Sequence, residues 1–268
     1  MDNTLELAYG EHPLQKLDLY WPKDATTEKG VASSTKPPLI VFCHGGAWRS
    51  EDKSEYVSFA QDLVGRTRAA VAIVNYRISP RKPEDGPALH HPAHAQDLLD
   101  ALHRLLEEQS MHFDANRMIL VGHSCGAHMT SSIILETTPL LEPSVALLSN
   151  VKGIVITAGI YDVDLLYTNP EYRDFIQGAF GDRKSYKDIS PAFLEGRKGA
   201  EHIQWLIVQS AGDSLIRQEQ ADAMVEGLKK ANLSVDMDNT SVSEEHFELL
   251  RTPGFYDLVD KMVIKCTR

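Results

Sequence analysis

Short, uninterrupted runs of apolar residues recur along the chain and indicate buried strands. The runs are Leu39–Cys43, Val71–Asn75, Met118–Gly122, Gly153–Thr157 and Trp205–Gln209. Runs of this length without polar alternation are typical of strands covered on both faces, as in a parallel sheet between two helical layers. A further strand is expected at Gln15–Trp21, where apolar and polar residues alternate and predict one buried face.

Helical spacing of apolar residues fills most of the intervals between these strands. Helices are expected at Tyr56–Arg66, Ala93–Gln109, Cys125–Leu135, Arg217–Ala231 and Tyr256–Ile264. Alternation of strands and helices along the whole chain predicts one doubly wound α/β domain over residues 1–268. Residues 161–199 are rich in Tyr, Asp, Pro and Gly and interrupt the alternation of strands and helices. They are expected to form an insertion over the C-terminal edge of the sheet, where ligands bind. A polar loop is expected at Lys23–Pro38.

Composition narrows the class of protein. The 268 residues are 43% hydrophobic and 24% charged, which is ordinary globular usage. The net charge of −11 disfavours binding to nucleic acid or to an anionic membrane surface. No segment has the apolar length of a membrane span or the features of a secretory signal. Three sparse cysteines do not suggest a disulfide framework, so a cytoplasmic location is expected.

A serine motif stands directly after one predicted strand. Gly122-His123-Ser124-Cys125-Gly126 matches G-x-S-x-G between a buried strand and a helix, which is the setting of a nucleophile elbow. Glycines on both sides of the serine let neighbouring backbone pass close to a strained turn. Ser124 is therefore the predicted nucleophile, and the backbone N–H of Cys125 would face the negative charge that develops during its attack.

A glycine pair follows the first long apolar strand. His44-Gly45-Gly46-Ala47-Trp48 occupies the place from which a hydrolase of this order supplies further oxyanion donors. Glycine allows the main chain to bend so that the amides of Gly46 and Ala47 face the same point as that of Cys125. A glycine pair alone indicates only a turn. Because the pair comes before the serine motif in the expected order, the two motifs together indicate a hydrolase more strongly than either does alone.

The order of the remaining residues selects a base and an acid. Hydrolases with this elbow place Asp or Glu, then His, after the serine. His128 follows Ser124 on the same helix and His202 precedes a strand, whereas His246 lies in a polar loop before the last helix, so His246 is the predicted base. Asp213 follows a buried strand and is the predicted orienting acid, and Asp162, Glu244 and Glu245 are its competitors.

Other clusters carry less weight. His90, His91 and His94 lack a carboxylate at ligand spacing on a defined element, so no metal is expected. Cys125 is expected to be a small buried thiol, not a nucleophile. Trp48 and Tyr161 are the candidate substrate contacts near the motifs.

With these motifs the chain resembles an α/β-hydrolase over nearly its whole length. HGGAW departs from the HGGG of lipase-like esterases and is similar to the HGGxW of metal-independent kynurenine formamidases. NYRISP and HPAHAQDLLDAL resemble stretches that both groups share. GIYDVDLLYTNPEYRDFIQGAFG, from Gly159 to Gly181, looks like a stretch of the fungal-type formamidases and falls in the predicted insertion.

The resemblance implies hydrolysis of N-formyl-L-kynurenine to L-kynurenine and formate, with no cofactor. It assigns Ser124, Asp213 and His246 to the triad, and Gly46 and Ala47 to the oxyanion hole. The expected substrate is a small molecule. Members of the family are often dimers, so a homodimer is expected. A general carboxylesterase for small acyl esters is the alternative, and a catalytically inactive hydrolase fold used for binding is a third.

Overall fold

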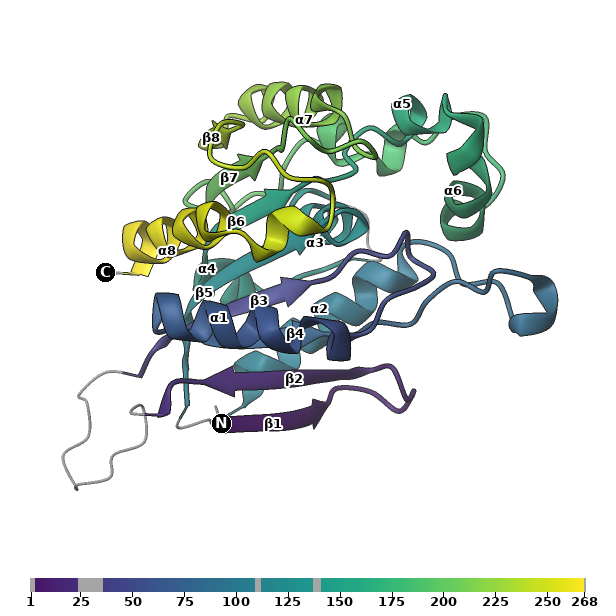
Figure 1. Ribbon diagram of the computed structural model, residues 1–268. Coiled ribbons are helices and arrows are strands. Elements are labelled where there is room, and N and C mark those ends of the chain that lie inside the picture. The colour runs from purple at the N-terminus through teal and green to yellow at the C-terminus, as the bar shows by residue number, and fades with distance from the viewer. Residues whose placement is uncertain (1–2, 24–35, 109–111, 137–140, 268) are drawn as a thin grey trace.

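The computed structural model describes residues 3–23, 36–108, 112–136 and 141–267, and these form a sheet flanked by helices (Figure 1). In the described residues the sheet has eight strands in the order β1-β2-β4-β3-β5-β6-β7-β8. The strands are β1 (Asn3–Ala8), β2 (Lys16–Trp21), β3 (Pro38–Cys43), β4 (Ala70–Val74), β5 (Asp114–His123), β6 (Val151–Thr157), β7 (Gln204–Val208) and β8 (Val235–Asp238). Strand β2 pairs antiparallel with β1 and β4, and the pairs from β4 through β8 are parallel.

The five apolar runs form the centre of this sheet, so the predicted doubly wound α/β class is confirmed. Their register places Cys43 beside Gly122, His123 beside Thr157, and Thr157 beside Val208. Because parallel strands end together at one edge, the segments that follow β3, β5, β6 and β7 all emerge there. The elements that position the candidate site therefore meet at this C-terminal edge.

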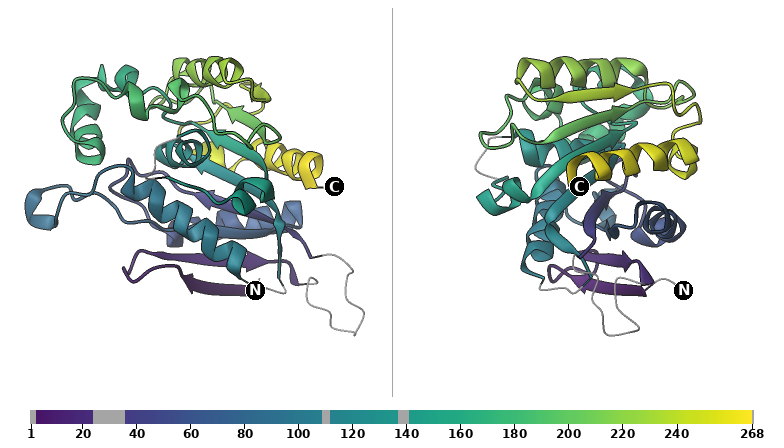
Figure 2. Two further views of the ribbon diagram at one scale, coloured as in Figure 1. Left: turned by 180° about the vertical axis from the view of Figure 1, so that it is seen from behind. Right: turned by 90° about the vertical axis from the view of Figure 1, so that its left-hand side faces the viewer.

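Helices cover both faces of the sheet. The longer helices are α1 (Val57–Thr67), α2 (Ala93–Glu107), α3 (Cys125–Leu135), α7 (Gln218–Lys230) and α8 (Pro253–Thr267). Apolar residues of α1 and α8 pack on one face, and those of α2, α3 and α7 pack on the other (Figure 2). Period-two alternation sends successive strand residues into the two layers, as Val41 and Phe42 show. Within the described residues, no helix combines the length and apolar character that a bilayer crossing requires.

Residues 161–199 form no sheet strand, as their composition predicts. They fold into α5 (Val163–Tyr167), α6 (Arg173–Phe180) and short 3₁₀ turns at Pro170–Tyr172, Lys187–Ile189 and Pro191–Phe193. Helices α5 and α6 project beyond the ends of the parallel strands (Figure 1). The predicted insertion thus lies beside the edge where the motif loops emerge.

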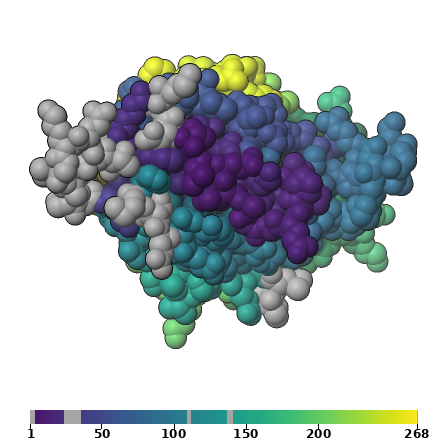
Figure 3. Space-filling model, turned by 90° about the horizontal axis from the view of Figure 1, so that it is seen from below, coloured from purple at the N-terminus to yellow at the C-terminus, as the bar shows by residue number. Residues whose placement is uncertain are grey.

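Some elements were not expected from the sequence. The edge strands β1 and β8 are short and contain polar residues, and α4 (Val145–Asn150) is only a turn and a half long. Strand β1 is exposed on the face shown in Figure 3. Strand β5 begins at Asp114, earlier than the predicted Met118. Most of the loop predicted at Lys23–Pro38 lies outside the described residues.

Candidate active site

Ser124 stands on a strained turn between β5 and α3. Its backbone adopts φ 55° and ψ −122°, a region that residues with a Cβ rarely occupy. A Cβ on Gly122 would lie 2.7 Å from the Cα of Ala127, and one on Gly126 would collide with the carbonyl oxygen of Cys43. Both glycines are therefore required for the close packing of the turn, and Ser124 remains 7% exposed at the C-terminal edge of the sheet.

Asp213 and His246 meet at the same edge. Asp213 follows β7, and its Oδ1 accepts hydrogen bonds from the backbone N–H groups of Leu215 and Ile216, both at 2.9 Å. Its Oδ2 is thereby left for Nδ1 of His246 at 2.8 Å. Since a carboxylate accepts hydrogen bonds, it favours the tautomer that carries its proton on Nδ1, which leaves Nε2 available as a base. Both side chains are almost fully buried.

The loop that carries His246 is itself anchored. Nε2 of His123 lies 2.9 Å from the carbonyl oxygen of His246, and the two rings are 4.6 Å apart. Burial lowers the pKa of His123 well below its usual value, so the ring is neutral and donates to that carbonyl. Glu245 accepts hydrogen bonds from the N–H and hydroxyl of Ser214, which ties the two loops together. This role of His123 was not predicted from the sequence, because it occupies a variable position of the G-x-S-x-G motif.

The glycine loop after β3 runs directly past the serine. A Cβ on Gly45 would lie 3.1 Å from Cβ of Ser124. Gly46, Ala47 and Trp48 all have positive φ, at 92°, 51° and 57°. A Cβ on Gly46 would collide with the carbonyl oxygen of Ser50, so this position requires glycine.

The thiol of Cys125 contacts the backbone of the glycine loop and supports it. Sγ of Cys125 accepts a hydrogen bond from the N–H of Trp48 at 3.3 Å, and the N–H of Ala47 also faces this sulfur. In the described residues, the N–H groups of Gly46 and Cys125 donate to no protein acceptor. Tyr76 donates its hydroxyl to the carbonyl of Gly45 at 2.5 Å, which fixes the loop from its other side. The motif did not reveal this role of the Cys125 side chain.

The two candidate substrate contacts are both fully buried. Trp48 packs edge-on against Phe180 and His128, with ring centroids 4.8 and 5.2 Å apart. Among the described residues, Nε1 of Trp48 and the hydroxyl of Tyr161 have no hydrogen-bond partner. Their contact with a substrate stays a prediction.

Three other candidates for the base and the acid make contacts of their own. Nε2 of His128 contacts the carbonyl of Ile189 at 2.9 Å, and that of His202 contacts the carbonyl of Val151 at 3.1 Å, at the opposite end of β6. Asp162 accepts from the N–H of Leu165 and so caps α5.

The histidine cluster near α2 makes its own contacts. His91 pairs with the carboxylate of Glu136 at 2.9 Å, and His94 lies 2.9 Å from the hydroxyl of Ser79. Over the described part of the chain, no group of three or more His, Cys, Asp or Glu side chains is placed to hold a metal ion.

An ion pair joins the glycine loop to the insertion. Arg49 pairs with Asp174 on α6, and its guanidinium lies 5.6 Å from the ring centroid of Phe175. The pair bridges 125 positions of sequence, so no local signal could have predicted it. Helix α6 is thereby held against the loop that borders Ser124.

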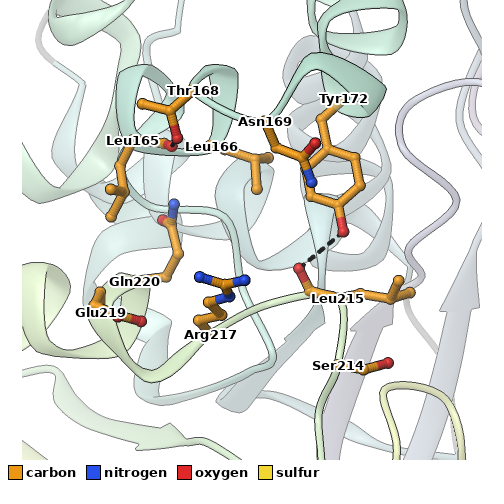
Figure 4. Close-up of a pocket in the computed structure, with 10 residues that line it drawn as sticks. All are labelled: Leu165, Leu166, Thr168, Asn169, Tyr172, Ser214, Leu215, Arg217, Glu219 and Gln220. Carbon is orange, nitrogen blue, oxygen red and sulfur yellow. Dashed lines mark hydrogen bonds between the residues drawn. The ribbon is translucent and has the colours of Figure 1, made fainter.

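A cavity of about 320 Å³ adjoins the acid loop (Figure 4). It lies between the α5–α6 part of the insertion and the start of α7. Its lining residues are Leu165, Leu166, Thr168, Asn169, Tyr172, Ser214, Leu215, Arg217, Glu219 and Gln220. Ser214 and Leu215 directly follow Asp213, so the cavity is next to the acid that holds His246.

Comparison with known proteins finds hydrolases of similar sequence. A family model described as alpha/beta hydrolase fold matches residues 40–242. A kynurenine formamidase of Meyerozyma guilliermondii is 30% identical over 241 residues, which cover 87% of this chain and 83% of that protein. A kynurenine formamidase-like hydrolase of Fusarium equiseti is 33% identical over 202 residues, which cover 66% of this chain and 64% of that protein.

Solved structures share the fold at lower identity. The truncated form of a carbohydrate esterase from gut microbiota superposes with a TM-score of 0.76 and 16% identity, over 98% of this chain and 95% of that one. At this identity the likeness concerns the fold alone.

Proposed function

The chain belongs to the α/β-hydrolase superfamily and, within it, to the kynurenine formamidase family, and on that premise we propose that it hydrolyses N-formyl-L-kynurenine to L-kynurenine and formate. The observation that carries the proposal is the Asp213–His246 hydrogen bond, formed at the edge where Ser124 stands on its strained turn. Chain order Ser, Asp, His agrees with the order in hydrolases of this kind. These three residues are the proposed triad.

The first half-reaction transfers the formyl group to the enzyme. Nε2 of His246 takes the proton of Ser124 while Oγ attacks the formyl carbon. The carbonyl oxygen gains negative charge and is stabilised by backbone N–H groups. Those of Gly46 and Cys125 donate to no acceptor among the described residues, and that of Ala47, which also faces Sγ of Cys125, is the third proposed donor. His246 then protonates the departing aryl nitrogen, the C–N bond breaks, and L-kynurenine leaves.

The second half-reaction restores the serine. A water molecule gives a proton to His246 and attacks the formyl ester, and the oxyanion occupies the same site. Collapse of the intermediate breaks the bond to Oγ of Ser124, which recovers its proton from His246, and formate is released. No metal or cofactor takes part in these steps.

The surroundings of Ser124 support a small acyl group. The serine is only 7% exposed, and a Cβ on Gly45 of the glycine loop would lie 3.1 Å from its Cβ, so the loop leaves little room beside it. An aryl amine is also a better leaving group than an alkyl amine, so a site of esterase type can cleave this amide. We further propose a cytoplasmic location, which the three free cysteines support.

Turnover of two substrates separates this function from the carboxylesterase alternative. The purified protein is assayed with N-formyl-L-kynurenine and with p-nitrophenyl acetate. The proposal requires formamide cleavage at a kcat/KM of at least about 10⁴ M⁻¹s⁻¹, the lower end of typical enzymes. Ester cleavage without measurable formamide cleavage rejects it in favour of the esterase. A labelled Ser124 after treatment with a fluorophosphonate probe rejects the catalytically inactive alternative.

A further inference from the structure

The cavity beside Asp213 is lined by both apolar and polar side chains, two of which, Arg217 and Glu219, are charged (Figure 4). Leu165 and Leu166 line it from α5, Tyr172 from the turn before α6, and Leu215 from the acid loop. Its volume of about 320 Å³ is at the lower end of the range for small-molecule sites.

Several polar groups in the lining are already engaged within the protein. Oε1 of Gln220 accepts from the N–H groups of Tyr161 and Asp162 at 2.8 Å, and Nε2 of Gln220 donates to the carbonyl of Asp162. Tyr172 donates its hydroxyl to the carbonyl of Leu215 at 3.2 Å. These bonds join the insertion to α7 and to the acid loop, so they build the cavity and are not available to a ligand.

Two charged side chains of the lining remain free. In the part of the chain that the structure describes, neither Arg217 nor Glu219 makes a side-chain hydrogen bond or an ion pair. Arg217 precedes α7 without capping it, and Glu219 lies in the first turn of that helix. Figure 4 shows the Arg217 guanidinium directed into the cavity. One cation and one anion thus flank the same opening.

Electrostatic interactions connect two residues of the cavity lining, Tyr172 and Arg217, to the proposed triad. Burial raises the pKa of Tyr172, the negative charges of Glu171 and Asp213 raise it further, and Arg217 opposes them. The phenol therefore lies within electrostatic range of both the acid that holds His246 and the free guanidinium. The cavity and the proposed triad thus share the loop that carries Asp213.

We propose that this cavity binds the leaving-group half of the substrate, with Arg217 pairing with an α-carboxylate and Glu219 with an α-ammonium group. The inference rests on the proposed function, because it concerns an aryl amine that carries an amino-acid side chain. A guanidinium binds a carboxylate through two parallel N–H···O bonds, which gives orientation as well as affinity. The leucines and Tyr172 would pack on the aryl ring. Arg217 and Glu219 are then specificity-determining residues for zwitterionic formanilides.

Two formanilides that share one reacting group test this inference. N-formyl-L-kynurenine carries the amino-acid group, and 2-formamidoacetophenone lacks it. Arg217→Gln should raise KM for N-formyl-L-kynurenine by about tenfold or more, since a charge-assisted contact of this kind is lost, with kcat changed less than twofold. The same variant should change kcat/KM for 2-formamidoacetophenone less than twofold. Glu219→Gln should show the same selectivity with a smaller effect.

Arg183→Gln is the matched control. Arg183 belongs to the same insertion, but it pairs with Asp188 outside the cavity, so its loss should leave both substrates unaffected. An equal loss on both substrates in Arg217→Gln, or no loss on either, overturns the inference while the proposed function stands. Failure of the wild type to cleave either formanilide overturns both.

Discussion

Nδ1 of His246 lies 2.8 Å from Oδ2 of Asp213, although the two residues are 33 positions apart and belong to different loops. The backbone N–H groups of Leu215 and Ile216 hold the other carboxylate oxygen, so the acid has little freedom to turn. His123 and Glu245 fix the loop that carries the imidazole. The proposed base is therefore oriented before any substrate arrives.

Asp213→Asn should lower kcat by about ten-thousandfold, with little change in KM. An amide in place of the carboxylate favours the wrong imidazole tautomer and does not stabilise the imidazolium. Steady-state kinetics with N-formyl-L-kynurenine measure the effect.

Asp162→Asn is the matched control for this change, because asparagine preserves the cap of α5. It should retain nearly all activity. If Asp213→Asn kept more than a tenth of wild-type kcat, another acid would have to orient His246.

Cys125→Ala should reduce kcat by about two- to tenfold. The substitution removes the sulfur that accepts the N–H of Trp48, and the loss of one hydrogen bond of this kind costs about 1 kcal/mol. The glycine loop then holds the proposed oxyanion donors less firmly. Cys266→Ala, on the last helix, should have wild-type kcat. Equal activity of the two variants would contradict a supporting role for Cys125.

Thiol reagents should not inactivate the enzyme. Burial raises the pKa of the Cys125 thiol to about 12, so almost no thiolate exists at pH 7.5 and the side chain is inaccessible. Incubation with iodoacetamide, followed by an activity assay and peptide mass mapping, should find Cys125 unmodified. Rapid inactivation with alkylation of Cys125 would show that the thiol is open to solvent.

Acid should destabilise the fold below about pH 6.5. Burial lowers the pKa of His44 to about 4 and that of His94 to about 3, so both are neutral when folded and gain protons on unfolding. Their stabilising effect is complete above the unfolded pKa near 6.5 and is lost as the pH falls toward the folded values. At pH 5.5 each such histidine should lower the free energy of unfolding by about 1.4 kcal/mol relative to pH 7.5.

Urea unfolding at pH 7.5 and 5.5 measures this dependence. His94→Gln keeps a donor near Ser79 but removes one titrating group. The difference in unfolding free energy between the two pH values should therefore shrink by about 1.4 kcal/mol in this variant. An unchanged difference would mean that His94 is not held neutral in the fold.

The sequence predicted the central sheet well because buried parallel strands leave continuous apolar runs. It missed β1 and β8, since short edge strands such as Val235–Asp238 retain polar residues and resemble loops. The elbow and the glycine loop were recognisable because steric demands restrict those positions to glycine.

Contacts between distant segments could not be predicted in the same way. The hydrogen bond from Trp48 to the Cys125 thiol and the ion pair of Arg49 with Asp174 depend on how separate loops pack. The free guanidinium of Arg217 also becomes visible only when the cavity around it is formed. Tertiary structure was needed to distinguish these residues from ordinary surface and core positions.

The most direct measurement compares Ser124→Ala with Ser131→Ala in turnover of N-formyl-L-kynurenine. Ser131 is buried on the same helix, and its hydroxyl has no partner among the described residues, so its loss should leave kcat near wild type. We expect the wild type to release L-kynurenine and formate, and Ser124→Ala to lose at least about a thousandfold in kcat. Release of both products by Ser124→Ala at the wild-type rate would contradict this prediction.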